Sequence, residues 1–267
     1  MSADRTTKRM HDPWESLKRF TDARIAIGRS GASLPTEEVL SFALAHARAR
    51  DAVHTSFCPQ PIEQGLQSLG LATIRAKSRV PDRATYLARP DYGRRLSRAS
   101  AEALSALDAA PSDIAIVIAD GLSTTAVAEN AVAFVSHLLP MLREANLTLA
   151  PVAIVENGRV ALGDEVGALL KARMVIMAIG ERPGLSSVDS LGAYLTFGPK
   201  IGRSDAERNC ISNIRPAGLK PKLAADKAFW LTHEALRHGL TGVNLKEAAG
   251  GLLSAKQELR PVCEGRR

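Results

Sequence analysis

The chain has 267 residues, of which 45% are hydrophobic, and its formal net charge at pH 7 is +7. This length and apolar content suffice for a substantial buried core in one large domain or two modest ones. No stretch approaches the roughly 20 consecutive apolar residues of a membrane span, and the amino end lacks the apolar region of a secretory signal. We therefore expect a cytoplasmic protein with no membrane partner.

The positive charge alone does not indicate a nucleic-acid partner. The 35 Lys and Arg residues are scattered, with one local group in residues 94–98, and the aromatic residues do not alternate with them as a base-stacking surface requires. The odd number of cysteines and the lack of C-x-x-C spacing argue against a disulfide framework and a zinc ribbon. The three cysteines are Cys58, Cys210 and Cys263.

The first part of the chain is predicted to be a tail, residues 1–23, followed by a mostly helical region, residues 24–100. A helix is expected from Pro35, because acidic residues fill its first turn and apolar residues recur at helical spacing. Gly and Pro break residues 55–82 into short pieces, with one helical piece near 62–69. We expect this region to contain helices and loops.

The pattern changes near residue 110. Apolar runs of strand length alternate with helical stretches, which is typical of a parallel sheet covered on both faces. The fold predicted for residues 101–254 is therefore α/β, a Rossmann-like parallel sheet flanked by helices, and residues 255–267 are predicted to be a tail. The runs are residues 114–120, 149–156 and 174–180, and the helical stretches are 126–142, ending near Pro140, 164–172 and 223–238.

Polar residues directly follow two of the predicted strands. Asp120 ends the first run, and Glu181, Arg182 and Pro183 follow the third at Gly180. Ligands of open α/β sheets bind outside the carboxyl ends of the strands, so these residues are candidates for a ligand site. The structural alternatives are a strand-end cap at Asp120 and an ion pair between Glu181 and Arg182.

Familiar catalytic motifs are absent from this sequence. It has no phosphate-binding G-x-x-x-x-G-K-[ST], no dinucleotide-binding G-x-G-x-x-G and no G-x-S-x-G elbow. His233 and His238 are five positions apart, whereas a helical zinc motif needs four, so we interpret them as helix-surface residues. Cys210 has no nearby histidine to activate it, and its structural interpretation is a small buried apolar side chain.

Four longer segments identify a family when taken together. They are YLARPDYGRRL (86–96), IADGLST (118–124), GERPGLSSVDSLGAYL (180–195) and ERNCISNI (207–214). In order and spacing they resemble the small, or light, subunit of adenosylcobalamin-dependent ethanolamine ammonia-lyase. The resemblance extends from about residue 24 to residue 242.

The resemblance implies a partner and a cofactor. Family members pair with a large barrel-shaped subunit, and adenosylcobalamin lies at the interface in its base-on form, with dimethylbenzimidazole retained on cobalt. The absence of an Asp-x-His-x-x-Gly loop agrees with that form. The implied reaction converts ethanolamine to acetaldehyde and ammonia by a radical mechanism whose chemistry belongs to the cofactor.

The resemblance also implies cofactor-binding residues. The family's cobalamin contacts correspond here to Val160, Glu181 and Cys210, which would make residues 101–254 a cobalamin-binding domain. Substrate contacts in the family lie mostly on the large subunit, so no catalytic residue and no metal ligand is assigned to this chain.

Two alternatives remain at this stage. The alternative function is a stand-alone Rossmann-like module that binds a small ligand and has no lyase activity. Some family members carry a long N-terminal extension that directs them to a bacterial microcompartment, which is the alternative location. The segment around Trp14, Leu17 and Phe20 would then be a short packaging element or simply a capping helix.

Overall fold

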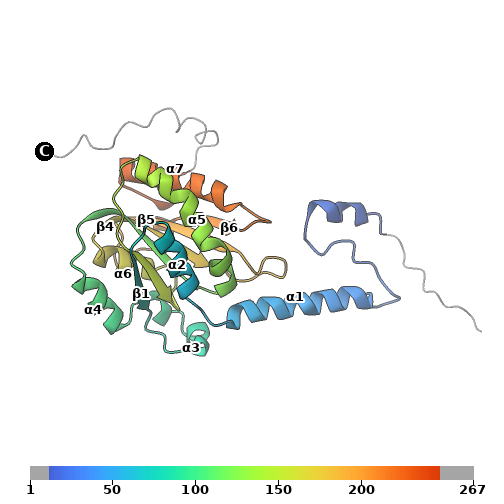
Figure 1. Ribbon diagram of the computed structural model, residues 1–267. Coiled ribbons are helices and arrows are strands. Elements are labelled where there is room, and N and C mark those ends of the chain that lie inside the picture. The colour runs from blue at the N-terminus through green and yellow to red at the C-terminus, as the bar shows by residue number, and fades with distance from the viewer. Residues whose placement is uncertain (1–11, 247–267) are drawn as a thin grey trace, which may run out of the picture.

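A six-stranded sheet flanked by helices forms the body of the molecule, and one long helix projects from it (Figure 1). The computed structural model describes residues 12–246. The start of the predicted N-terminal tail, the predicted C-terminal tail and Cys263 lie outside the described residues. The α/β class predicted from the sequence is confirmed.

The helices and strands are named in chain order. The strands are β1 (Thr73–Lys77), β2 (Ser112–Ala119), β3 (Val152–Glu156), β4 (Ala172–Gly180), β5 (Leu191–Phe197) and β6 (Asn209–Ile214). The α-helices are α1 (Thr36–His54), α2 (Gln60–Ser68), α3 (Arg83–Ala88), α4 (Arg98–Ala106), α5 (Thr124–Glu144), α6 (Leu162–Leu169) and α7 (Pro221–His238). Short 3-10 helices are η1 (Glu15–Phe20), η2 (Tyr92–Arg94), η3 (Asp205–Glu207) and η4 (Gly242–Asn244).

The sheet is mixed. Its strand order is β1-β3-β2-β4-β5-β6, and the first four strands are parallel. The last two differ from the expected parallel arrangement, because β5 runs antiparallel to β4 and β6 antiparallel to β5. The three apolar runs found in the sequence are the three central strands β3, β2 and β4.

The central strands read as continuous apolar runs because helices cover both faces. Alternate residues of β2, such as Ile116 and Val117, belong to two separate core clusters, as the period of a strand requires. Helices α2, α5 and α7 contribute to the cluster on one face, and α4 and α6 to the cluster on the other. The middle residues of these strands are therefore buried on both faces, and the polar residues lie at the strand ends.

Helix α5 is the one described helix that is long and apolar enough, by length and composition, to cross a membrane. Its apolar side chains, including Phe134 and Leu138, lie in the core cluster that it shares with the sheet, and this packing accounts for its hydropathy. The helix does not end near Pro140 as expected but continues to Glu144. Pro140 lies on the exposed side, while Leu142 keeps the last turn buried.

Three strands were missed in the sequence, and all have weaker patterns than the central ones. Edge strand β1 carries Arg75 and Lys77, and it lies in the region that was expected to be mostly helical. Edge strand β6 is mostly polar, with an irregular burial pattern. Strand β5 follows the Gly- and Ser-rich loop after β4, and nothing local marks its reversed direction.

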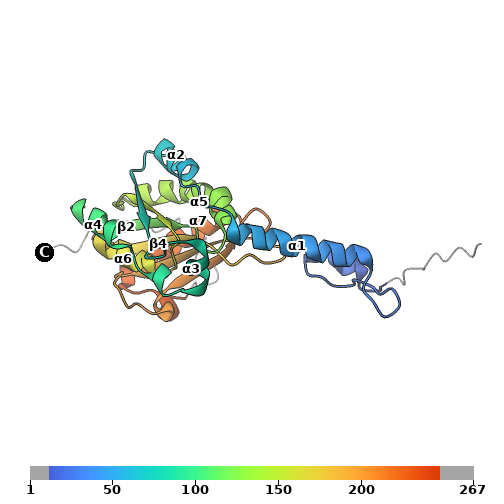
Figure 2. The same ribbon diagram turned by 90° about the horizontal axis from the view of Figure 1, so that it is seen from below.

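Helix α1 extends away from the body together with η1, and we call residues 12–55 the arm. Figures 1 and 2 show the arm projecting from the body in two perpendicular views. The helix expected from Pro35 is confirmed, but Ala52 is its only buried residue. The segment around Trp14 forms the 3-10 helix η1, which has no buried residue.

Candidate functional site

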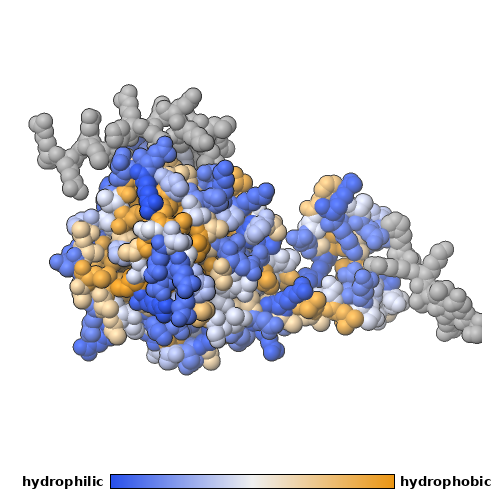
Figure 3. All heavy atoms as spheres, viewed as in Figure 1, coloured by the Kyte–Doolittle hydropathy of each residue, from blue (hydrophilic) through white to orange (hydrophobic). Residues whose placement is uncertain are grey.

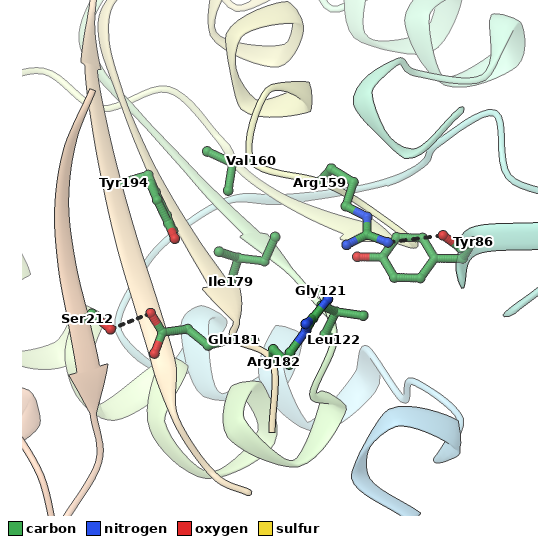
Figure 4. A pocket seen from close by; sticks show the side chains of 11 residues that line it. Tyr86, Gly121, Leu122, Arg159, Val160, Ile179, Glu181, Arg182, Tyr194 and Ser212 are labelled. Atoms are coloured by element: carbon green, nitrogen blue, oxygen red, sulfur yellow. Dashed lines mark hydrogen bonds between the residues drawn. The ribbon is translucent and has the colours of Figure 1, made fainter. Parts of the chain in front are cut away.

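A pocket of about 440 Å³ lies where the parallel strands end. It opens at the carboxyl edge of the sheet, which is where the sequence predicted a ligand site. Figure 4 shows side chains from strands, loops and α3 facing one space. Its lining residues come from five places: Tyr86 of α3; Gly121 and Leu122 after β2; Arg159 and Val160 after β3; Ile179, Gly180, Glu181 and Arg182 at the end of β4; and Tyr194 and Ser212 of β5 and β6.

All four sequence segments that carry the family resemblance contribute to this pocket. Tyr86 comes from the first segment, Leu122 from the second, Glu181 from the third and Ser212 from the fourth. These segments are far apart in the sequence. The fold therefore brings them to one surface of the molecule.

The topology explains why a hollow forms at this place. Strand β2 leads into α5 on one face of the sheet, whereas its neighbour β3 leads into α6 on the other. The two connecting loops therefore diverge, which leaves a crevice between them at the topological switch point.

Two glycines let the ends of β2 and β4 approach closely at the base of the pocket. The backbone N–H of Leu122 donates to the carbonyl of Gly180 at 2.9 Å. A Cβ on Gly121, whose φ is +56°, would lie 2.2 Å from that carbonyl oxygen, and one on Gly180 would lie 2.1 Å from the carbonyl oxygen of Ser123. Glycine is needed at both positions because any side chain would separate the two strand ends.

Glu181 connects three strands. Its Oε2 accepts hydrogen bonds from the Ser190 hydroxyl at 2.5 Å and from the backbone N–H of Asn213 at 3.1 Å, and its Oε1 accepts from Ser212 at 2.7 Å. The structural alternative of an ion pair with Arg182 is not what the structure shows, since Arg182 is exposed and Glu181 is held by these three donors. Oε1 accepts a hydrogen bond from Ser212 alone among the described residues, so it retains acceptor capacity toward the pocket.

Val160 and Arg159 form the wall contributed by the loop after β3. Val160 is half-buried and presents an apolar surface to the pocket. Arg159 donates from Nη2 to the carbonyl of Tyr86 at 3.1 Å, and its backbone N–H donates to the carbonyl of Gly93 at 2.8 Å. These contacts hold a cationic side chain in place at the pocket wall.

Tyr86 lies between two guanidinium groups. The Arg159 Cζ atom lies 4.1 Å from the ring centroid of Tyr86, and the Arg83 Cζ atom lies 4.6 Å from it. The hydroxyl donates to the carbonyl of Gly158 at 3.0 Å, and burial raises the pKa of this phenol. The ring is fully buried and therefore gives α3 a fixed position beside the pocket.

Asp120 is a buried carboxylate at the end of β2. It pairs with Arg83 at 3.1 Å and accepts hydrogen bonds from the backbone N–H groups of Gly121 and Gly158. Burial raises the pKa of Asp120 to about 7, although Arg83 and these N–H groups act in the opposite direction. Asp120 is thus an internal strand-end cap, as its structural interpretation proposed, and it does not line the pocket.

Cys210 is exposed. Its interpretation from the sequence as a small buried side chain is therefore wrong. It does not line the pocket, but it pairs with Tyr194, which does. Desolvation by the surrounding strands raises the pKa of the thiol even though the side chain retains contact with solvent. Of the three residues implied by the resemblance, the fold therefore brings Val160 and Glu181 into the pocket and leaves Cys210 at its rim.

Sequence reasoning missed Tyr86, Arg159 and Ser212 as pocket residues. The sequence did contain a signal for them: Tyr86 and Ser212 lie within the segments that carry the family resemblance, and Arg159 directly precedes Val160. Within residues 12–246 there is no group of three or more His, Cys, Asp or Glu residues suited to a metal ion. His233 lies on α7 beside Glu234, as expected of a helix-surface residue.

The fold and the pocket define an α/β protein with a Rossmann-like ligand site at the carboxyl edge of its sheet. A family model described as "Ethanolamine ammonia-lyase light chain (EutC)" matches residues 11–246. The chain therefore belongs to the ethanolamine ammonia-lyase light chain family, and it is a subunit of a lyase.

Curated relatives agree along most of the chain. The ethanolamine ammonia-lyase small subunit of Bradyrhizobium diazoefficiens is 54% identical over 236 residues, which cover 88% of this chain and 90% of the relative. The small subunit of Azotobacter vinelandii is 52% identical, with 89% of both chains covered. That of Rhodopseudomonas palustris is 53% identical, with 86% of this chain and 88% of the relative covered. The names light chain and small subunit imply a larger partner subunit.

Proposed function

We propose that this small subunit uses the carboxyl-edge pocket to hold part of adenosylcobalamin against the larger subunit of an ethanolamine ammonia-lyase. The observation that carries the proposal is the meeting of four distant segments at one pocket, with Val160 and Glu181 in its wall. Together the two subunits convert ethanolamine to acetaldehyde and ammonia, and the larger subunit supplies the substrate contacts.

The residues of the pocket are suited to a corrin. Val160 and Tyr194 offer apolar surface, and the free acceptor capacity of Glu181 Oε1 suits the amide N–H groups at the corrin periphery. A pocket of about 440 Å³ that is open to solvent holds only part of so large a cofactor. A second wall is therefore required, and the larger subunit provides it.

When bound, the cofactor supplies a carbon-centred radical, which is chemistry that no protein side chain offers. We propose the base-on form, because the sequence lacks the Asp-x-His-x-x-Gly loop that would supply a histidine to cobalt. The role of this chain is to bind, orient and exclude water: Val160 and Tyr194 cover apolar surface, and Glu181 accepts hydrogen bonds. We propose the cytoplasm as the location of the complex, with a bacterial microcompartment as the alternative.

The test is an activity assay of the chain with and without its larger subunit. We expect no acetaldehyde from ethanolamine and adenosylcobalamin with this chain alone, and production once the larger subunit is added. Val160→Trp should fill the pocket and weaken cofactor binding by the complex by about tenfold or more. Acetaldehyde production by the single chain, or unchanged cofactor binding by an intact Val160→Trp complex, would refute the proposal.

A further inference from the structure

The arm exposes apolar side chains on more than one side of α1. Val39, Leu40, Phe42 and Leu44 are 48%, 64%, 47% and 52% exposed. At 100° per residue these four positions span about 200° of the helix circumference, whereas a helix that packs on a single surface presents a narrower stripe. Figure 3 shows hydrophobic residues gathered at the surface along α1.

Exposure of this extent requires an occupant in the assembled protein. Monomeric soluble proteins rarely expose large contiguous apolar patches, and such patches mark interaction sites. Because the apolar positions face several directions, the matching surface is a groove that encloses the helix rather than a flat face. The family model begins at residue 11 and so includes the whole of α1. The arm is therefore part of the shared family chain, and its occupant is a component that light chains have in common.

The base of α1 is fastened to the residues that surround the pocket. Arg83 Nε donates to the carbonyl of Val53 at 2.7 Å, and the Thr124 hydroxyl donates to the carbonyl of Thr55 at 3.3 Å. Arg83 also pairs with Asp120 at the end of β2. The C-terminal end of α1 is therefore anchored to residues that neighbour those lining the pocket.

Charge argues against a second copy of this chain as the occupant. Two copies would each carry a net charge of +7. Helix α1 itself carries charges of both signs, with Glu37 and Glu38 in its first turn and Arg48 and Arg50 near its end. Association of two whole copies would bring like net charges together. The names light chain and small subunit already imply a different partner, the larger subunit.

We propose that α1 is a docking handle that inserts into an apolar groove of the larger subunit. This inference rests on the proposed assembly, and it assigns to the arm a role separate from cofactor binding. The arm supplies affinity between the subunits, and its base directs the pocket toward the partner. Helix-in-groove recognition of this kind uses apolar anchors at helical spacing.

The test compares full-length variants for binding to the purified larger subunit by calorimetry. The double variant Leu40→Glu/Phe42→Glu should bind at least ~100-fold more weakly, because two apolar anchors are lost and two charges must be desolvated. Its thermal unfolding in isolation should match that of the wild type, since both side chains are exposed in the free chain. The matched control is Ile201→Glu. Ile201 is 54% exposed and follows β5, which runs antiparallel to β4 and therefore ends on the side of the sheet away from the pocket.

Three results would overturn the inference, and they are distinguishable. Wild-type affinity of the double variant for the larger subunit would show that the arm is not the handle. A change only in self-association, measured by analytical ultracentrifugation of the isolated chain, would assign the arm to a second copy. Failure of both the wild type and the Ile201→Glu control to bind the larger subunit would refute the proposed assembly and, with it, the handle.

Discussion

The body and the arm place their apolar residues in opposite ways. In the body, leucines such as Leu138 lie fully buried between helices and sheet, whereas Leu40 in the arm is 64% exposed. Both lie on long helices rich in Leu and Ala. The body therefore has its own hydrophobic core, whereas the arm leaves large apolar side chains at the surface.

The largest expected effect uses this matched pair of leucines. Leu138→Ala should lower the free energy of unfolding of the isolated chain by about 2–5 kcal/mol, because it opens a cavity in the core. Leu40→Ala should change that free energy by less than about 0.5 kcal/mol, since it removes an exposed side chain. Urea denaturation of both variants measures the contrast. Equal destabilisation would show that α1 packs against the body in solution.

A matched pair of glycines sharpens the same contrast with an effect of similar size. Gly121 and Gly31 both have positive φ, +56° and +62°, but a Cβ on Gly31 meets no atom within 4 Å. Both alanine substitutions carry a conformational cost of about 1–2 kcal/mol, and Gly121→Ala adds about 1–3 kcal/mol for the collision with the carbonyl of Gly180.

We therefore expect a clear loss of stability in urea denaturation only for Gly121→Ala. Strain at Gly31 lies in the arm and should leave the unfolding of the body unchanged. A Gly121→Ala variant as stable as wild type would contradict the close approach of β2 and β4 that forms the base of the pocket.

The sequence predicted the parts of the fold in which one physical requirement dominates. Strands β2, β3 and β4 are buried on both faces, so their apolar runs were unmistakable. Edge strands β1 and β6 are half-solvated, and their charged and polar residues resemble those of loops. The reversed direction of β5 is set by its pairing with β4, which no local pattern encodes.

The candidate site was predicted in location but not in composition. The carboxyl edge followed from the general behaviour of α/β sheets, and Glu181 followed from its place after β4. Arg159 and Tyr86 contribute through contacts made across about 70 residues of sequence, and such pairs cannot be read from one chain. The interpretation of Cys210 as buried was wrong because edge strand β6 leaves that side chain exposed.

The pH dependence of stability tests the buried end of β2 with a smaller effect. Burial raises the pKa of Asp120 to about 7 from an ordinary 3.8, so the folded state binds this proton more tightly than the unfolded state. The contribution of Asp120 is therefore fully present below about pH 4 and is lost as the pH rises toward 7, with a slope of at most about 1.4 kcal/mol per pH unit.

Asp120→Asn is the variant that reveals this contribution, because the amide cannot ionise. Urea denaturation at several pH values between 4 and 7 should show a decline in wild-type stability that the variant lacks. Parallel pH profiles for the two proteins would show that the ion pair with Arg83 fully offsets the burial of the carboxylate.

The central claim is that Glu181 faces the cofactor. Glu181 also joins three strands through its hydrogen bonds within the protein, and the test must separate this structural role from cofactor binding. Ser190 provides the control, because its hydroxyl binds Glu181 Oε2 while Ser190 does not line the pocket. Both Glu181→Ala and Ser190→Ala should lower thermal stability, the latter by about 0.5–1.5 kcal/mol.

The most direct measurement is titration of adenosylcobalamin into assembled complexes that carry either variant. We predict that Ser190→Ala leaves the cofactor dissociation constant unchanged, whereas Glu181→Ala raises it by about three- to 100-fold, the equivalent of one lost hydrogen bond to a buried donor. Ethanolamine affinity should remain at the wild-type value in both. Wild-type cofactor affinity in an intact Glu181→Ala complex would contradict the account, because Glu181 would then serve only to join β4, β5 and β6.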